Sequence, residues 1–394
     1  MVKSHIETFL RIRPSEYVIG QINSNSMTSR EYSDRYDVIT DSNEMNYEVN
    51  NNNLIEIKLP EEMRKGYVNN LKRTYEFKYD GVFDITSSQE DIFECVGEKV
   101  IKNSIEGYNN TVFCYGQTGS GKTFTMCGSK QWKERGLIPR ILIDLFKQIK
   151  TAKDYSYEIF ISYLEIYNEN AYDLLDRNHS EIEMENWRKI IVYEDNNGNI
   201  MMKNLSMIKV ENEQQALDLL ITGNYIRHVS STPNNLASSR SHAVFSCVIE
   251  GRQLNSDLMK VSKINLVDLA GSERLKSNQY DTNTINETKY INLSLSFLEQ
   301  VIMALNEKSK GQRLHIPYRN SLMTTILKDS LGGNCKTILI ANVSSDADNL
   351  DETFSTMRFA VRCGKVENEI KVNEHMDLNI LVSKLHSENQ ELRK

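Results

Sequence analysis

Apolar residues along this 394-residue chain recur with two periods, one typical of strands and one typical of helices. Alternating or continuous apolar runs predict strands, because successive side chains of a strand point to opposite faces. The predicted strands cover residues 6–13, 54–59, 75–79, 111–115, 158–166, 243–250, 264–269 and 337–343. Residues 190–200 contain an Asn-Asn-Gly turn between two such runs and predict a hairpin.

Apolar residues three and four positions apart predict helices over residues 89–107, 137–149, 214–221, 287–306 and 321–330. Strands that alternate with helices indicate a three-layer α/β domain with a largely buried sheet. No Pro/Gly-rich linker interrupts this pattern. We therefore predict a single domain over residues 1–366.

Two segments depart from the pattern. Residues 15–53 are rich in Asn, Ser and charge and end in four consecutive asparagines, which predicts a surface insertion. Residues 378–394 carry leucines at positions 378, 381, 385 and 392, a spacing that resembles the a and d positions of a coiled coil. Because this segment would make only about 26 Å of helix, it is either the start of a neck helix or short coiled coil, or a solvated capping helix.

The composition limits the class of protein. Hydrophobic residues make up 39% of the chain, which is ample for a core at this length. A net charge of −7, from 47 basic and 54 acidic residues, argues against general nucleic-acid binding. The chain has neither a run of about 18 apolar residues, as a membrane span needs, nor an apolar signal region at its start. Six cysteines without CxxC spacing indicate reduced thiols in a cytosolic protein, without a metal site or disulfides.

Residues 116–123 read Gly-Gln-Thr-Gly-Ser-Gly-Lys-Thr, which is a complete phosphate-binding loop between a predicted buried strand and the start of a helix. Glycines let backbone N–H groups approach phosphates, and a helix N-terminus adds positive potential. Lys122 would reach the β- and γ-phosphates, and the Thr123 hydroxyl would ligate Mg²⁺. The predicted nucleotide-binding residues of the loop are Gln117, Thr118, Gly119, Ser120, Gly121, Lys122 and Thr123.

A second motif follows the predicted strand 264–269, where the sequence from residue 264 reads Ile-Asn-Leu-Val-Asp-Leu-Ala-Gly-Ser-Glu. Asp268 at the strand end can hold Mg²⁺, usually through water. The Gly271 N–H can bond the γ-phosphate, since only glycine lets the backbone come so close. Asp268 alone could be an ordinary strand-end residue, but beside a phosphate loop it predicts a nucleotide-sensing turn.

A third motif covers residues 235–242, Asn-Leu-Ala-Ser-Ser-Arg-Ser-His. Hydroxyls and an arginine on a polar loop suit a segment that orders around γ-phosphate and Mg²⁺. Arg240 and Glu273 carry opposite charges on two such loops, and a salt bridge between them would close the site. Exposed pairs contribute only about 0–1 kcal/mol, so the value of this pair would be geometric. In isolation, a Ser-rich loop is more simply explained as solvated surface.

Together these three motifs resemble the nucleotide elements of a kinesin motor domain. Supporting matches lie at residues 11–14, 77–83, 163–169, 315–319, 329–334 and 358–360, in the same order as in kinesins. The resemblance covers about residues 5–375. Residues 64–70 and 294–300 further resemble the ninth kinesin family, which is associated with cilia and flagella.

The resemblance implies a microtubule-stimulated ATPase motor with a central mixed, mostly parallel sheet flanked by helices. ATP or ADP and Mg²⁺ are the expected cofactors. Arg11, Pro14 and Tyr108 would sandwich the adenine, and Phe124 would pack on the purine. Mg²⁺ would be held by Thr123, Ser239 and Asp268. The expected catalytic residues are Ser238 and Gly271 near the γ-phosphate, and Glu273 with Arg240, which orient water.

The resemblance also places a track-binding surface and a neck linker. Lys308, Lys310, Arg313 and Arg319 would face the acidic tubulin surface, with a salt-sensitive attraction. Leu293, Leu322 and Thr325 stand where kinesins commonly carry cations, which puts tight binding in doubt. Residues 367–377 resemble a neck linker in which Ile370 and Val372 would add as a strand and Asn373 would latch it. A linker C-terminal to the motor implies plus-end direction.

Microtubules are the expected partner, without nucleic acid or membrane, and a homodimer would form through a coil beyond residue 394. The expected location is the cytoplasm and cytoskeleton, with the axoneme of a cilium or flagellum as the finer placement. A microtubule-binding scaffold with a silent nucleotide site is the main alternative. A signalling GTPase is opposed by the absence of an Asn-Lys-x-Asp motif, and a depolymerising kinesin by the lack of a basic N-terminal extension.

Overall fold

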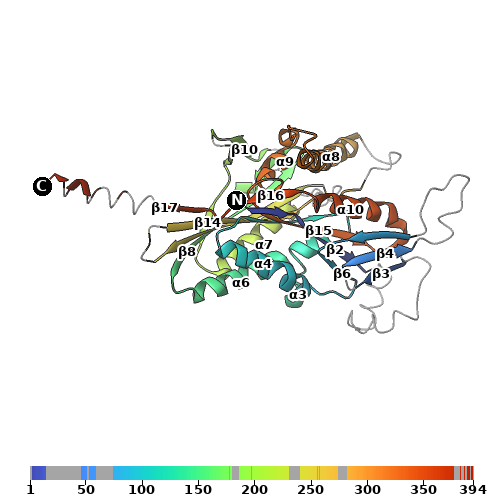
Figure 1. Ribbon diagram of the computed structural model, residues 1–394, viewed down its shortest axis with the longest axis horizontal. Helices are drawn as coiled ribbons and strands as arrows, with labels where there is room; N and C mark the ends of the chain where they lie inside the picture. The colour runs from blue at the N-terminus through green and yellow to red at the C-terminus, as the bar shows by residue number, and fades with distance from the viewer. Residues whose placement is uncertain are drawn as a thin grey trace, which may run out of the picture.

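The computed structural model describes residues 2–14, 46–50, 53–58, 74–176, 178–179, 186–196, 198–229, 240–254, 256, 258–273, 282–376 and isolated positions of the tail, and the statements below concern those residues. A large sheet lies between two layers of helices (Figure 1). This is the three-layer α/β architecture that the alternation of strands and helices predicts.

The centre of the large sheet is parallel. β7 (Asn110–Tyr115) lies between β14 (Leu258–Asp268) and β15 (Lys336–Ser344) and runs parallel to both. β2 (Glu7–Arg13) extends the parallel part beyond β15, followed by β6 (Gly81–Phe83). All six residues of β7 are buried, as its continuous apolar run indicates for a strand covered on both faces.

The other half of the sheet is antiparallel, so the expectation of a mostly parallel sheet holds for the centre alone. After β14 the order is β13 (His242–Gln253), β8 (Tyr155–Tyr167), β9 (Asn170–Asp173), β10 (Lys189–Glu194) and β11 (Ile200–Lys203). β12 (Ile208–Val210) pairs with β8, and β17 (Glu374–Met376) with β14. The tight β8–β9 turn uses Asn168 and Glu169 at φ 49° and 55°, in place of the glycine that usually marks such a turn.

Two smaller sheets lie against this framework. β1 (Val2–His5) pairs with β16 (Glu367–Ile370), so the two ends of the motor segment meet. β3 (Asn46–Asn50), β4 (Leu54–Lys58) and β5 (Thr74–Lys78) form an antiparallel sheet. Residues 46–50 thus belong to a strand, although they fall within the predicted insertion. The rest of that insertion, apart from residue 53, lies outside the described residues.

One helical layer covers the lower face of the sheet in Figure 1. It consists of α3 (Gln89–Ile92), the π-helical turn η2 (Phe93–Gly97), α4 (Glu98–Ile105), α6 (Leu137–Thr151) and α7 (Glu213–Val229). A short 3₁₀ turn, η3 (Trp132–Glu134), precedes α6. The predicted helix 89–107 is therefore divided by a π-turn. The apolar side chains of this layer pack on one face of the central strands as one of two core clusters.

The upper layer consists of α8 (Thr282–Ser309), α9 (Leu322–Ile326) and α10 (Leu350–Cys363). Three 3₁₀ turns accompany these helices, namely η7 (Tyr318–Asn320), η8 (Lys328–Ser330) and η9 (Ala347–Asn349). The second core cluster fills the space between this layer and the sheet. Among the described residues, none of the helices is long and apolar enough to cross a membrane.

Candidate nucleotide site and track-facing surface

The phosphate loop lies at the carboxyl end of β7, between that strand and α5 (Lys122–Met126). Gly116 has φ 152°, and a Cβ at this position would collide with the carbonyl oxygen of Asn342 on β15. Glycine is therefore required here, because the loop lies directly against the neighbouring strand. The motif and its strand–loop–helix setting are those predicted from the sequence.

Lys122 is turned into its own loop. Its Nζ donates to the carbonyl oxygens of Gly116 and Gln117, each at 2.8 Å. Burial lowers the pKa of Lys122, while the nearby Asp268 and Glu273 oppose that shift. The ammonium group is thus fixed where a phosphate bound to the loop would meet it.

The two predicted Mg²⁺ ligands in the described part are brought together. Thr123 Oγ1 donates to Asp268 Oδ2 at 2.8 Å. The other carboxylate oxygen, Asp268 Oδ1, is buried and has no hydrogen-bond partner among the described residues. A hydroxyl and an unsatisfied carboxylate oxygen are hard ligands of the kind that Mg²⁺ takes alongside phosphate oxygens, so these residues fit the ion. The third predicted ligand, Ser239, lies outside the described residues.

Arg227, near the end of α7, holds Asp268 from the other side and was not singled out by the sequence motifs. Its Nη1 donates to Asp268 Oδ2 at 2.9 Å, and its Nε lies 3.6 Å from Glu165 Oε1. All three side chains are buried. Burial by itself lowers the pKa of Arg227, but Asp268, Tyr163 and Glu165 raise it overall. Burial also raises the pKa of Glu165, partly offset by Arg227.

The turn after β14 is fastened to the phosphate loop through Glu273. Its carboxylate accepts from the Thr118 N–H at 2.7 Å and from the Thr118 hydroxyl at 2.5 Å. A Cβ on Gly271 would meet both the Glu273 carboxylate and the Thr118 hydroxyl, so a larger residue would displace the side chains that fasten the turn. Arg240 is half-buried just before β13, and its pairing with Glu273 stays a prediction. Ser238 lies outside the described residues.

His242 links the two predicted nucleotide-sensing segments to α8. Its Nδ1 accepts from the Ala270 N–H at 3.0 Å, so Nε2 carries the proton and donates to Ser294 Oγ at 2.8 Å. Burial, followed by the charges of Arg227 and Lys122, lowers the pKa of His242 to about 3. The imidazole is therefore a neutral connector between the turn after β14 and the long helix of the upper layer.

Three of the predicted adenine contacts lie near the loop and one does not. The Arg11 guanidinium lies 5.2 Å from the ring centre of Phe124, which is 38% exposed, and Pro14 follows β2 at the same end of the sheet. Tyr108 precedes β7 at its amino end, where Lys336 lies over its ring. Six strand residues span about 20 Å, so Tyr108 cannot share a base pocket with Arg11. The role that the resemblance implied for Tyr108 is therefore wrong, and we do not assign it to the nucleotide site.

The predicted track residues are exposed on the upper face. Lys308 and Lys310 lie at and after the end of α8, and Arg313 pairs with Glu307 at 3.2 Å. The Arg319 guanidinium is 83% exposed and lies 2.7 Å from Glu194 at the end of β10. Two of these cations are thus paired with carboxylates of their own chain, which the sequence did not indicate.

Glu194 also binds Lys328 at 2.6 Å, so one carboxylate joins the β10–β11 hairpin to both ends of the α9 region. A cavity of about 470 Å³ opens beside this junction, lined in part by Tyr193 and Leu322. Leu322 is half-buried and packs on the apolar core of the upper layer. The absence of a cation at this position therefore has a packing reason.

The predicted neck-linker residues run along the sheet. Ile370 is buried in β16, and a Cβ on Gly107 would touch Val372. The Asn373 N–H donates to the Gly107 carbonyl at 2.9 Å, and its carbonyl accepts from the Val261 N–H at 3.0 Å. The Asn373 side chain accepts from Asn334 Nδ2 at 2.8 Å. The segment is held by backbone and side chain alike.

The fold and the loop define a phosphate-loop nucleotide-binding protein whose strand-end turn closes on that loop. The family model of the kinesin motor domain matches residues 30–366, and the chain belongs to this family. Kinesin motor domains are microtubule-associated ATPases. The kinship expected from the three nucleotide motifs is thereby confirmed.

The relatives are consistent with the ninth kinesin family. Kinesin-like protein KIF9 of Mus musculus is 41% identical over 340 residues, which are 86% of this chain and 42% of the mouse protein. Kinesin-like protein KLP1 of Chlamydomonas reinhardtii is 38% identical over 342 residues, which are 86% of this chain and 43% of that protein. The chain spans less than half the length of these curated relatives.

Solved kinesin structures share the fold. The structure of a fast kinesin has a TM-score of 0.78 and 34% identity, and the match covers 94% of each chain. A KIF14 dimer in complex with a microtubule and AMP-PNP also has a TM-score of 0.78 and 34% identity, over 94% of this chain and 97% of that one.

The described residues contain no group of three or more His, Cys, Asp or Glu side chains that could hold a metal ion by themselves.

Proposed function

We propose that this chain is an ATP-hydrolysing motor that moves toward the plus end of microtubules. One observation carries the proposal: the turn of residues 268–273 closes on the phosphate loop at two points. Asp268 accepts from Thr123, and Glu273 accepts from Thr118. A turn fastened in this way can sense the nucleotide phosphates and pass their state to the rest of the molecule.

The residues of the site divide the work of phosphoryl transfer, which rests on positioning and charge stabilisation. Lys122 would neutralise the phosphates, and the Gly271 N–H would bond the γ-phosphate. Thr123 and Asp268 hold Mg²⁺, with Ser239 as the further proposed ligand, and the bound ion supplies charge stabilisation between the phosphates. Glu273, closed by Arg240, orients the attacking water, with Ser238 beside the γ-phosphate.

Force output rests on the upper layer and on the segment after α10. His242 connects the nucleotide turn to α8, whose far end carries the exposed Lys308. Residues 367–377 act as the neck linker, and their position C-terminal to the motor supports plus-end movement. We propose that the protein works on the cytoskeleton, and the resemblance to the ninth kinesin family favours a cilium or flagellum.

ATP turnover with and without microtubules tests the proposal. Turnover of the wild type is expected to rise with added microtubules. Lys122→Ala is expected to abolish nucleotide binding, because it removes the cation from the centre of the loop. Lys99→Ala, at an exposed lysine paired with Glu7, is the matched control and should behave as wild type. Unchanged turnover in Lys122→Ala would contradict the phosphate-loop assignment.

A microtubule-binding scaffold with a silent nucleotide site is the second candidate. The pairing of Arg313 and Arg319 with their own carboxylates favours it slightly, because these cations then offer less to an acidic track. Co-sedimentation with microtubules in ADP and in AMP-PNP separates the two readings. A motor changes its affinity with the nucleotide, whereas a scaffold binds equally in both.

A further inference from the structure

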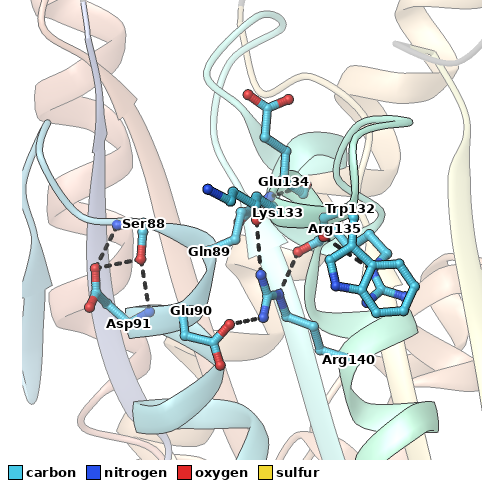
Figure 2. Close-up of polar contacts among 9 residues, drawn as sticks. All are labelled: Ser88, Gln89, Glu90, Asp91, Trp132, Lys133, Glu134, Arg135 and Arg140. Atoms are coloured by element: carbon cyan, nitrogen blue, oxygen red, sulfur yellow. Dashed lines mark hydrogen bonds and ion pairs between the residues drawn. The ribbon is translucent and has the colours of Figure 1, made fainter. Parts of the chain in front are cut away.

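Gln89, the first residue of α3, is a buried amide whose polar groups are all satisfied by other elements. Its Nε2 donates to the Phe124 carbonyl at 2.6 Å and to the Glu134 carbonyl at 3.2 Å. Its Oε1 accepts from Arg11 Nη1 at 3.0 Å. Figure 2 shows Gln89 beside the loop that carries Glu134. One side chain therefore ties together β2, α5 and the segment before α6.

Gln89 holds both groups that flank the base site. The Arg11 guanidinium donates to the Gln89 amide oxygen, and the Gln89 amide nitrogen donates to the backbone carbonyl of Phe124. Arg11 also donates to Thr125 Oγ1 at 2.7 Å, and among the described residues it makes no ion pair. Burial lowers the pKa of Arg11 to about 10, so the guanidinium stays charged at neutral pH. This buried cation is held by neutral acceptors and lies over the ring of Phe124, which is itself 38% exposed, so the pair offers a flat surface at the edge of the base site.

We propose that Gln89 is the positioning residue of the base site, which holds Arg11 and Phe124 in contact with each other and so fixes the surface on which a purine stacks. The inference rests on the proposed nucleotide function and extends it to a residue outside the three nucleotide motifs. Because its amide is fully used, Gln89 does not read the base edge. It contributes to affinity for the base moiety and leaves the phosphate contacts to the loop.

The neighbouring loop offers a way to separate this role from plain structural support. Arg140 holds that loop without Gln89, since its Nε donates to the Arg135 carbonyl at 2.7 Å and its Nη2 to the Lys133 carbonyl at 2.9 Å. Its Nη1 also pairs with Glu90 (Figure 2). Removing the Gln89 amide leaves these contacts in place and frees Arg11 and the backbone carbonyls of Phe124 and Glu134.

The experiment measures binding of Mg²⁺·ATP and of Mg²⁺·tripolyphosphate, which lacks the base, to the whole chain. Gln89→Leu is expected to weaken ATP about ten-fold, as the loss of a hydrogen bond to a charged group does. Tripolyphosphate should bind as to wild type, and kcat at saturating ATP should be kept. Gln148→Leu, which loses an amide bond to Asp144 on α6, is the matched control and should change neither.

Gln89→Glu retains an acceptor for Arg11 but loses the donor to the two carbonyls, so it should recover only part of the ATP affinity lost in Gln89→Leu. A double variant of Gln89→Leu with Arg11→Lys should be little worse than Arg11→Lys alone, because the two residues act as a unit. If Gln89→Leu does not fold, Arg11→Lys alone still tests the idea through its selective loss of ATP over tripolyphosphate.

Equal weakening of ATP and tripolyphosphate in Gln89→Leu would overturn the inference, since it would indicate a general structural role. Unchanged ATP affinity in a folded Gln89→Leu would overturn it as well. Failure of the wild type to bind ATP would instead contradict the proposed function. The two failures are therefore distinguished by the wild-type measurement.

Discussion

Two arginines show how differently charge is used at the two functional faces. Arg227 is 3% exposed and lies between two buried carboxylates, Asp268 and Glu165, beneath the phosphate loop. The Arg319 side chain is 83% exposed and meets Glu194 on the upper surface. A buried charge cannot lose its partner without a large cost, whereas an exposed one exchanges its partner for water. The nucleotide end is therefore a fixed assembly, and the track-facing side a set of replaceable contacts.

The sharpest contrast is expected between Arg227→Met and Arg319→Met. Arg227→Met leaves two buried carboxylates uncompensated and should lower the free energy of unfolding by about 3–5 kcal/mol. Arg319→Met should change it by about 0–1 kcal/mol. Denaturant unfolding of both variants checks this. Similar losses at the two positions would contradict the difference in stability contribution between the buried and the exposed arginine.

A large effect on catalysis is expected from the turn that closes on the loop. Glu273→Ala should bind Mg²⁺·ATP but hydrolyse it about 10²-fold more slowly, as the loss of one positioned group does. Arg240→Ala should behave similarly. The double variant should be little worse than either single variant, because the two residues are proposed to act as a pair. Single-turnover kinetics measure the hydrolysis rate of each variant, and independent, multiplicative losses would contradict the joint action of Glu273 and Arg240.

The pH dependence of stability should follow His242. Its pKa of about 3 lies below the value near 6.5 of an unfolded histidine, so the unfolded state takes up the proton first. The contribution of neutral His242 to the free energy of unfolding is fully present above pH 6.5. It is lost as pH falls toward 3, by up to about 1.4 kcal/mol per pH unit. His242→Gln should flatten this part of the unfolding profile. The same change at the exposed His375 serves as control, and an equal flattening there would refute the assignment.

The smallest effect is expected at the track-facing side. Glu194→Gln releases Arg319 and Lys328 from their shared carboxylate and should tighten microtubule binding several-fold, since each exposed contact contributes about 0.2–1 kcal/mol. The gain should shrink as salt rises, because exposed charges are screened within about 8 Å. Co-sedimentation at two salt concentrations measures it. Glu158→Gln removes a comparable pair with Lys209 from β8 and should leave binding unchanged; a gain there too would indicate a non-specific charge effect.

The sequence predicted those parts whose geometry demands particular residues. Gly116 could be recognised because a loop pressed against Asn342 leaves no room for a Cβ, and Lys122 because the phosphate-loop motif specifies its spacing from that glycine. Arg227 could not, since its partner Asp268 lies 41 residues away and the contact exists only after α7 packs on the sheet. Gln89 escaped notice for the same reason. A local pattern carries no information about which distant amide or carboxylate will lie beside it.

The misassigned features have a common cause as well. Tyr108 was assigned to the adenine through the kinesin resemblance, although β7 separates it from the loop. The sheet was expected to be mixed but mostly parallel, with an antiparallel hairpin over residues 190–200, because a local pattern does not show that β13 will pair antiparallel with both β8 and β14. Leu322, which stands where kinesins commonly carry a cation, packs on the apolar core instead. In each case an interaction in space decided against the local pattern.

The position of β7 has a mechanical consequence. The nucleotide loop leaves its carboxyl end, while Gly107 just before its amino end holds the backbone of Asn373. Between these points all six strand residues are buried, and β14 and β15 flank them on both sides. Such a strand is closely packed on both faces and is therefore a rigid element of the fold. In the proposed motor, the upper helices would therefore shift against β7, and load on the neck linker would be carried by the same strand that leads into the nucleotide loop.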